Sequence, residues 1–203
     1  IVALLRPDHG TIEVGGANIS LFNPLELQKF RRTVGILFQT AALFDSMSVR
    51  ENILYPLKEL ATFDYDEMED RLENVAKQLD ILEIIDQEIE DLSVGEKKRV
   101  GLARAIIHRP RVILYDEPTT GMDPLISNMV DDLIVKVGAA DPDLTSIVIS
   151  HDLKATLEIA DQIIMLYQGK CVLSGTPEEF KNSQDLVVRQ FFSGKSHGPM
   201  KFF

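Results

Sequence analysis

Apolar residues in this chain form short continuous runs and longer helically spaced sets, and the two kinds alternate. The short runs have the composition of buried parallel strands. They occupy residues 34–38, 112–115 and 145–150. The helically spaced sets and their start signals predict helices at residues 48–60, 64–82, 93–108 and 124–138. Strands that alternate with helices predict an α/β fold built on a parallel sheet.

Polar residues mark the starts of several of these helices. Ser48 followed by Glu51 resembles a capping box, and Ser93 is a candidate N-cap for the helix that follows it. Asp123-Pro124 combines an acidic N-cap with proline at the first helical position. Pro56 lies inside the first of the four helices, so a kink or a break is expected there.

The remaining segments predict smaller elements and the two chain ends. Hairpins are expected at 11–21 and 162–174, and short helices at 24–32, 152–160, 176–179 and 185–192. Residues 1–5 resemble the end of a buried helix, so we expect the chain to be truncated at its N-terminus. Residues 193–203 are expected to form a flexible tail. No linker is long enough to divide the chain, which predicts a single domain over 1–203.

Composition narrows the class of protein. The 203 residues are 45% hydrophobic and 26% charged, which suits one soluble domain with a real core. The net charge of −11 argues against a nucleic-acid-binding surface. The lone Cys171 excludes an internal disulfide framework. No apolar run approaches the ~18 residues that a membrane-spanning helix needs.

Two carboxylates end the apolar run at 112–115. Asp116 follows the run directly, and Glu117 comes next. Ligands of open α/β sheets bind beyond the carboxyl ends of the strands, and Mg²⁺ prefers carboxylate and phosphate oxygens. Asp116 is therefore a candidate Mg²⁺ ligand, and Glu117 is a candidate for polarising a water molecule. Taken alone, the pair is equally consistent with an acidic turn.

Other polar residues follow strands or open a helix. Gln39 and His151 each come after a strand, and both fit contacts to Mg²⁺ or to a phosphate. Ser93 and Gly95 open a helix whose N-terminus is a candidate anion site. Taken alone, Gln39, His151 and the capped helix start are each more often structural than functional. The cationic residues that follow, Lys97, Lys98, Arg99 and Arg104, are expected to form a solvated face with one or two ion pairs.

Taken together, five motifs in this order resemble the nucleotide-binding subunit of ABC transporters. They are Gln39, Leu92-Ser93-Val94-Gly95-Glu96, Val112-Ile113-Leu114-Tyr115-Asp116-Glu117-Pro118, Gly121-Met122-Asp123-Pro124 and Ile149-Ser150-His151-Asp152. The resemblance implies a P-loop NTPase-like ABC ATPase domain, with a parallel core sheet, flanking helices and a helical subdomain at about 45–108. It also implies ATP and Mg²⁺ as cofactors.

The resemblance implies a role for each motif residue. Asp116 and Gln39 would hold Mg²⁺, Glu117 would be the general base, and His151 would contact the γ-phosphate. Ser93, Gly95 and Glu96 belong by this resemblance to the signature motif, and Asp123 to the D-loop. Such domains work as head-to-tail pairs, in which the signature of one subunit closes on the ATP of the other.

A finer resemblance connects the chain with the ATPases of Mla/Mce-type lipid transporters. It rests on segments 37–39, 42–49, 51–57 and 188–194. It implies transport of phospholipids or related lipids between bacterial membranes, an integral membrane permease and, indirectly, a substrate-binding protein of the Mce class. By analogy, residues 41–57 would dock a cytoplasmic helix of the permease. The subunit would be cytoplasmic and peripheral on the inner face of the cytoplasmic membrane, with no nucleic-acid partner.

The chain departs from the family pattern in two respects. No G-x-x-x-x-G-K-[S/T] occurs in these 203 residues, so we expect them alone neither to bind ATP tightly nor to hydrolyse it. In the signature, Val94 and Glu96 replace the usual glycine and glutamine, and Val94 is compatible only with a negative φ. Two alternatives stay open: a non-catalytic interaction module, and an ABC protein of DNA repair or translation that transports nothing.

Overall fold

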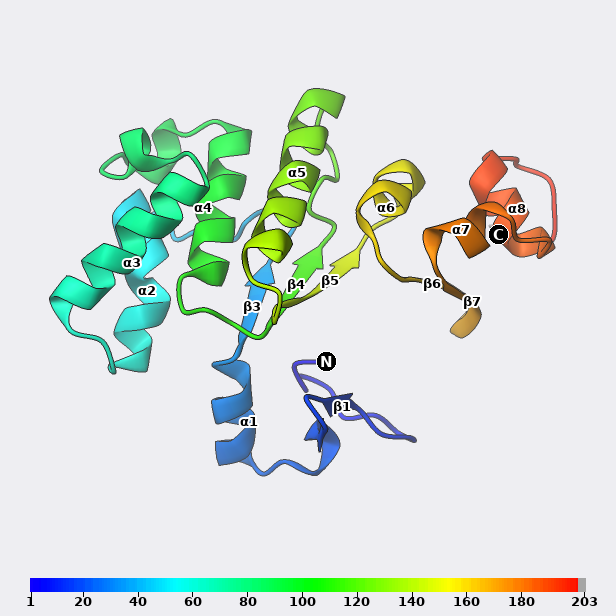
Figure 1. The fold of residues 1–203 in the computed structure, drawn as a ribbon, viewed down its shortest axis with the longest axis horizontal. Helices are drawn as coiled ribbons and strands as arrows, with labels where there is room; N and C mark the ends of the chain where they lie inside the picture. Colours follow the sequence, from blue (N-terminus) through cyan, green and yellow to red (C-terminus); the bar gives the residue numbers. More distant parts are fainter. Residues whose placement is uncertain (201–203) are drawn as a thin grey trace. The chain divides into compact units, whose positions relative to one another are not determined.

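The computed structural model describes residues 1–200, which fall into two compact units divided between Ile149 and Ser150. The first unit contains a parallel sheet of three strands, β3 (Val34–Leu37), β4 (Val112–Asp116) and β5 (Thr145–Ile149), in the order β3-β4-β5 (Figure 1). Leu37 lies opposite Tyr115, and Asp116 lies opposite Ile149. The three carboxyl ends therefore meet at one edge of the sheet, as the pattern of short apolar runs predicts.

Helices of the first unit pack on the sheet and on one another. They are α1 (Pro24–Arg31), α2 (Val49–Leu60), α3 (Tyr65–Gln78), α4 (Val94–Ile106) and α5 (Pro124–Ala140). Helix α4 packs against β3 and α2, and α3 packs against α2 (Figure 1). A Cβ built on Gly35 of β3 would lie 2.3 Å from the Ala105 carbonyl oxygen, so only glycine permits this approach of α4 to the sheet.

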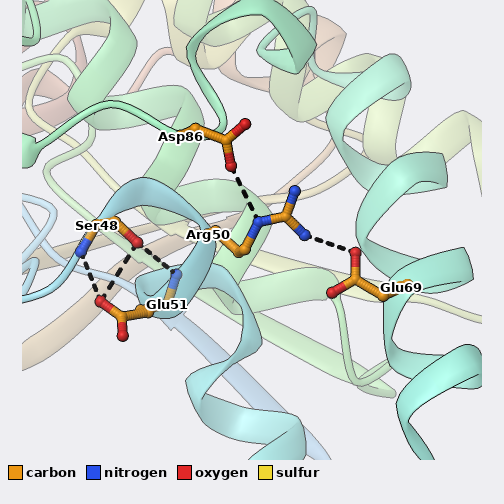
Figure 2. A network of polar contacts seen from close by, with 5 residues as sticks. All are labelled: Ser48, Arg50, Glu51, Glu69 and Asp86. Carbon is orange, nitrogen blue, oxygen red and sulfur yellow. Dashed lines mark hydrogen bonds and ion pairs between the residues drawn. The ribbon is translucent and has the colours of Figure 1, made fainter.

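Four of the predicted helices begin with reciprocal capping hydrogen bonds. Ser48 and Glu51 form such a capping box at α2 (Figure 2), and equivalent boxes open α1, α4 and the short helix α7 (Pro177–Lys181). Helix α2 continues through Pro56 to Leu60, so of the two predicted alternatives the break is wrong and the kink stays a prediction. The buried apolar side of α2 (Val49, Ile53 and Leu57, each fully buried) holds the helix in place.

Arg50 joins α2 to two other segments of the first unit. Its guanidinium forms ion pairs with Glu69 of α3 and with Asp86, which lies between the short 3₁₀ helices Leu82–Ile84 and Ile89–Asp91 (Figure 2). Both contacts are partly exposed to solvent, and Glu69 is the more buried partner. This cation therefore ties together three parts of the expected helical subdomain.

Two expectations for the first unit are wrong. Residues 1–5 form no helix in this structure, and Leu4 and Leu5 are 79% and 87% exposed, so no apolar packing within residues 1–200 holds them in a helix. Strand β5 is not buried, and Ile149 is 58% exposed. Among residues 1–200, β5 pairs only with β4, so it is an edge strand. The N-terminal hairpin forms as predicted, from β1 (Glu13–Val14) and β2 (Ala17–Asn18), and the 3₁₀ helix Ile19–Leu21 follows it.

The second unit is built on a hairpin. It comprises α6 (Leu153–Ile159), β6 (Ile163–Tyr167), β7 (Lys170–Gly175), α7 and α8 (Leu186–Ser193). The hairpin turns at Gln168 and Gly169, both with positive φ, as predicted. Its core consists of Met165, Phe180, Val188 and Met200.

The expected C-terminal tail lies partly outside the described residues, which end at residue 200. Within the described part, Met200 is buried, and its backbone N–H donates to Gln190 Oε1 at 2.7 Å. The flexibility of this segment and the single domain over 1–203 stay predictions. Every helix among residues 1–200 is too short or too polar to cross a bilayer.

Candidate functional site

Gln39 and Asp116 lie at the same edge of the parallel sheet. Asp116 is the last residue of β4, and Gln39 follows the end of the neighbouring strand β3 by two residues. Both side chains are exposed, so this edge is open to a ligand. The sheet therefore brings together an amide and a carboxylate that the sequence predicted to be neighbours.

Glu117 occupies a strained turn immediately after Asp116. Its φ of +48° lies in the left-handed region, which is uncommon for residues other than glycine and is concentrated at functional sites. The backbone N–H of Glu117 donates to the Ile149 carbonyl at 3.0 Å, which fixes the turn against β5. The Thr120 hydroxyl donates to Glu117 Oε2 at 2.6 Å. Backbone and side chain of Glu117 are thus both held in place at the edge of the sheet.

His151 belongs to the second unit. It follows β5 by two residues and is exposed. The next residue, Asp152, caps α6 by accepting a hydrogen bond from the Ala155 N–H at 3.1 Å. The place of His151 beside Asp116 and Glu117 stays a prediction.

The N-terminus of α4 is closed by a reciprocal contact between Ser93 and Glu96. Glu96 Oε2 accepts hydrogen bonds from the Ser93 hydroxyl at 2.6 Å and from its backbone N–H at 2.8 Å. The Ser93 hydroxyl bond, followed by the backbone bond, holds the pKa of Glu96 below its ordinary value. Val94, 62% exposed, begins the helix with a negative φ, so the valine is compatible with this turn.

Gly95 and Asp123 have structural contacts in the same part of the molecule. A Cβ on Gly95 would lie 3.3 Å from Met129 Cε of α5, so the glycine lets α4 and α5 approach closely. Asp123 Oδ1 accepts hydrogen bonds from the N–H groups of Leu125 and Ile126, at 2.9 and 3.1 Å, and caps α5 as predicted. Gly95 therefore shapes the contact between α4 and α5, and Asp123 shapes the start of α5.

The donor set at the sheet edge suits Mg²⁺ bound together with phosphate. Among residues 1–200, no three His, Cys, Asp or Glu side chains are grouped to hold a metal ion by themselves. Mg²⁺ is usually bound through one or two carboxylates, with phosphates and water as its other ligands. Asp116, with Gln39 beside it, fits that requirement. The glycine-rich phosphate-binding motif is not part of this sequence.

Two residues that the sequence placed on a solvated face bind backbone carbonyls instead. Lys98 is 4% exposed and donates to the carbonyl of Gln39 at 2.5 Å. Arg104 donates to the carbonyls of Ala41 and Ala42 at 2.7 and 2.9 Å. The prediction is correct for Arg99, which pairs with Asp80 at 3.1 Å. Positions 98 and 104 each lie three residues from Gly101, which faces Leu37 of β3. That spacing was the available signal that both cations lie toward the sheet.

A cavity of about 480 Å³ lies next to the segment that follows β3. Aromatic and cationic side chains line it, and they come from the end of α1, from α2 and α4, and from the segment that follows β3. They include Arg31, Arg32, Phe38, Phe44, Tyr55 and Arg104. Phe38 and Phe44 are 45% and 40% exposed, so the cavity presents an aromatic surface to solvent. It overlaps the segment 41–57 that was expected to dock a permease.

The family model described as ABC transporter matches residues 1–120. The chain is 34% identical over 218 residues to the chloroplastic protein Trigalactosyldiacylglycerol 3 of Arabidopsis thaliana. It is 35% identical over 206 residues to the intermembrane phospholipid transport system ATP-binding protein MlaF of Haemophilus influenzae. These alignments cover 100% and 98% of this chain, but 63% and 75% of the two relatives.

Among solved structures, the chain is similar to cbiO1 from Clostridium perfringens, described as part of the ABC transporter complex cbiONQ. The TM-score is 0.83 at 28% identity, over 93% of this chain and 74% of that one. This likeness confirms the predicted α/β architecture.

Proposed function

Because this chain belongs to the ABC transporter family, we propose that it forms most of the ATP-binding and ATP-hydrolysing subunit of a bacterial ABC transporter. The observation that carries the proposal is the edge of the sheet, where Gln39, Asp116 and Glu117 follow neighbouring parallel strands. Hydrolysis of ATP needs charge neutralisation, an oriented water molecule and contacts to the γ-phosphate. These residues suit the first two requirements.

In this mechanism each residue acts on one part of the reaction. Asp116 and Gln39 would hold Mg²⁺, and the bound ion would supply positive charge to neutralise the phosphates. Glu117 accepts a hydrogen bond from the attacking water and polarises it, and Thr120 orients the Glu117 carboxylate through the hydrogen bond at 2.6 Å. His151 contacts the γ-phosphate.

The site is completed by a second copy of the subunit. Ser93 and Val94 open α4 at an exposed position, so the N-terminus of α4 is accessible to a partner. In the head-to-tail arrangement, Ser93, Gly95 and Glu96 of one subunit face the ATP of the other, and Asp123 lies at the interface between the two. The N-terminal N–H groups of α4 favour an anion there.

The transported substrate is a phospholipid or a related lipid. MlaF of Haemophilus influenzae is described as part of an intermembrane phospholipid transport system, and the name of the Arabidopsis relative also refers to a lipid. We assign the aromatic cavity beside Phe38 and Phe44 to a cytoplasmic helix of the permease. An Mce-class protein takes part indirectly, and the subunit lies on the inner face of the cytoplasmic membrane.

The experiment that tests the proposal is ATP hydrolysis by the complete subunit in its native membranes. Glu117→Gln keeps the shape of the side chain but removes its basicity, so turnover falls by at least about 100-fold while ATP still binds. Glu83→Gln, a carboxylate exposed in a distant 3₁₀ helix, is the control and keeps wild-type turnover. Equal turnover in all three proteins would overturn the catalytic proposal and favour a non-catalytic interaction module.

A further inference from the structure

Helix α4 holds the backbone that follows β3 through its side chains. Lys98 Nζ donates to the carbonyl oxygens of Phe38 and Gln39, at 3.4 and 2.5 Å. Arg104, almost two turns further along the helix, donates to the carbonyls of Ala41 and Ala42. Four carbonyl groups in a stretch of five residues are therefore bound by one helix.

This segment is strained, and α4 lies unusually close to it. Ala41 and Ala42 have φ values of +61° and +46°, which L-residues rarely adopt. A Cβ on Gly101 would lie 2.8 Å from Ala41 Cβ, so α4 touches the segment directly between its two cationic residues. A strained backbone persists only where its surroundings fix it, and here the surroundings are the side chains of α4.

Lys98 is a buried cation whose partners in the described part of the chain are backbone carbonyls and not a carboxylate. It is 4% exposed, and among residues 1–200 its hydrogen-bond partners are the two backbone carbonyls. Desolvation lowers the pKa of its ammonium group to about 8, so keeping this cation buried disfavours the folded state at neutral pH. A well-packed apolar side chain would avoid that penalty, but the Gln39 carbonyl would lose its lysine donor, and the Phe38 carbonyl would keep the bond from the Ala41 N–H.

We propose that Lys98 is a positioning residue for Gln39: hydrogen bonds from its side chain to the Phe38 and Gln39 carbonyls link the Mg²⁺-binding glutamine to the helix that begins at Ser93. The catalytic part of this proposal rests on the proposed function. A displacement of α4 that follows contact at Ser93 is passed to Gln39 through Lys98, five residues further along the same helix. The position of Gln39 therefore depends on what is bound at Ser93, at the N-terminus of α4 in the same subunit.

Two variants of similar shape separate the hydrogen bonds from the packing. Lys98→Met removes every donor and keeps an unbranched side chain, while Lys98→Gln has nearly the same shape and keeps an N–H donor. Lys97→Met, a change to the neighbouring and more exposed lysine, is the control for loss of one positive charge on α4. All are made in the complete subunit.

The first measurement is hydrogen exchange at individual amides. The Ala41 N–H donates to the Phe38 carbonyl at 2.9 Å, so it reports on the segment that Lys98 binds. The Phe44 N–H is held instead by Asn52 Oδ1 at 2.8 Å and serves as an internal reference. Lys98→Met raises exchange at Ala41 about fivefold or more and leaves Phe44 within about twofold, while Lys98→Gln and Lys97→Met stay near wild type.

The second measurement is the ATP hydrolysis of the same proteins. Lys98→Met lowers kcat by about tenfold and changes KM by less than about twofold, because the misplaced Gln39 affects the reacting complex more than ATP binding. Lys98→Gln restores most of the loss. If Lys98 were purely structural, kcat would not fall while KM stays nearly constant, and Lys98→Gln would not restore kcat.

The outcomes distinguish this inference from the proposed function. Unchanged exchange at Ala41 in Lys98→Met would overturn the hydrogen-bond link, and so would an equal increase in Lys98→Met and Lys98→Gln. If Lys98→Met loosens Ala41 but its kcat and KM equal those of an active wild type, the link exists and its role in positioning Gln39 is overturned. If the wild-type subunit hydrolyses no ATP, the proposed function fails, while the exchange data still decide the contact.

Discussion

The Ser93 hydroxyl donates a hydrogen bond of 2.6 Å to Glu96 Oε2, so the serine at the start of α4 is already engaged by a carboxylate of its own helix. An anion that binds at this helix end must compete with Glu96 for that hydroxyl or share it. The negative charge of Glu96 also opposes a phosphate at the same position. The reciprocal capping bonds that stabilise the helix therefore weaken the anion site that the helix provides.

Removing the charge of Glu96 tests this competition. Glu96→Gln keeps an acceptor oxygen for Ser93, so we expect the free energy of unfolding to change by less than about 1 kcal/mol. Turnover of the complete protein should stay within about tenfold of wild type, because the change tunes closure without altering the reacting groups. Steady-state ATP hydrolysis checks this, and complete loss of activity or a far larger gain would contradict it.

The burial of Lys98 predicts a pH dependence of stability. Its pKa is about 8 in the folded protein and 10.5 as the ordinary value, so between these pH values the unfolded chain binds more protons. Wild type should therefore gain stability relative to Lys98→Met as pH rises from about 8 to 10.5, by roughly 1 to 3 kcal/mol, and lose that gain as pH falls back to 8. Urea unfolding at both ends of this range measures the difference, and parallel pH profiles would exclude it.

Asn52 predicts a large cost from a single truncation. It is fully buried, donates to the carbonyls of Phe44, Met47 and Ser48, and accepts from the Phe44 N–H at 2.8 Å. Asn52→Ala leaves the Phe44 N–H and the Met47 carbonyl without their Asn52 partner, while the Phe44 and Ser48 carbonyls keep their bonds from the Met47 and Asn52 backbone N–H groups. The free energy of unfolding should therefore fall by about 2 to 4 kcal/mol.

Asn74 on α3 offers a matched control for this truncation. It is exposed, and its side chain donates to the Asp70 carbonyl. Asn74→Ala should change stability by less than about 0.5 kcal/mol in the same chemical denaturation experiment. Similar values for the two alanine variants would show that the network around Asn52 contributes little.

Arg50 predicts a small contribution that depends on salt. Its ion pairs with Glu69 and Asp86 are partly exposed, so Arg50→Met should lower the free energy of unfolding by about 1 kcal/mol or less. Most of this difference should vanish in about 0.5 M NaCl, because exposed charges are screened. Thermal unfolding at low and high salt checks it, with the exposed Lys58→Met as control. A loss that persists at high salt would mean that the stem of Arg50 stabilises by packing.

Local signals predicted most of the fold. The capping residues Ser48, Ser93 and Asp123 predicted helix starts because their hydrogen bonds involve neighbours only two or three residues away. Asp116 was predicted at the sheet edge because the apolar run before it ends there. The exposure of β5 was not predictable, since it depends on which strands flank β5 in space.

Long-range contacts explain what the sequence analysis missed at the site. Lys98 looked like one member of a charged stripe, and its partners lie about 60 residues earlier in the chain. The left-handed conformations at Ala41, Ala42 and Glu117 could not be predicted, because none of these residues is a glycine. Their conformations depend on contacts made by Arg104 and by the Ile149 carbonyl, which only the tertiary structure brings into place.

The central claim is that Glu117 of one subunit and Ser93 of the other serve the same ATP. Its most direct test is ATP hydrolysis by purified complexes that contain two differently tagged copies of the complete subunit, one or both carrying Ser93→Arg or Glu117→Gln. With the two substitutions on different copies, one site keeps both residues and activity should remain. With both substitutions on one copy, each site loses one residue and activity should disappear. The reverse order of activities would contradict the claim, since it would show that Ser93 and Glu117 act on an ATP bound by their own chain.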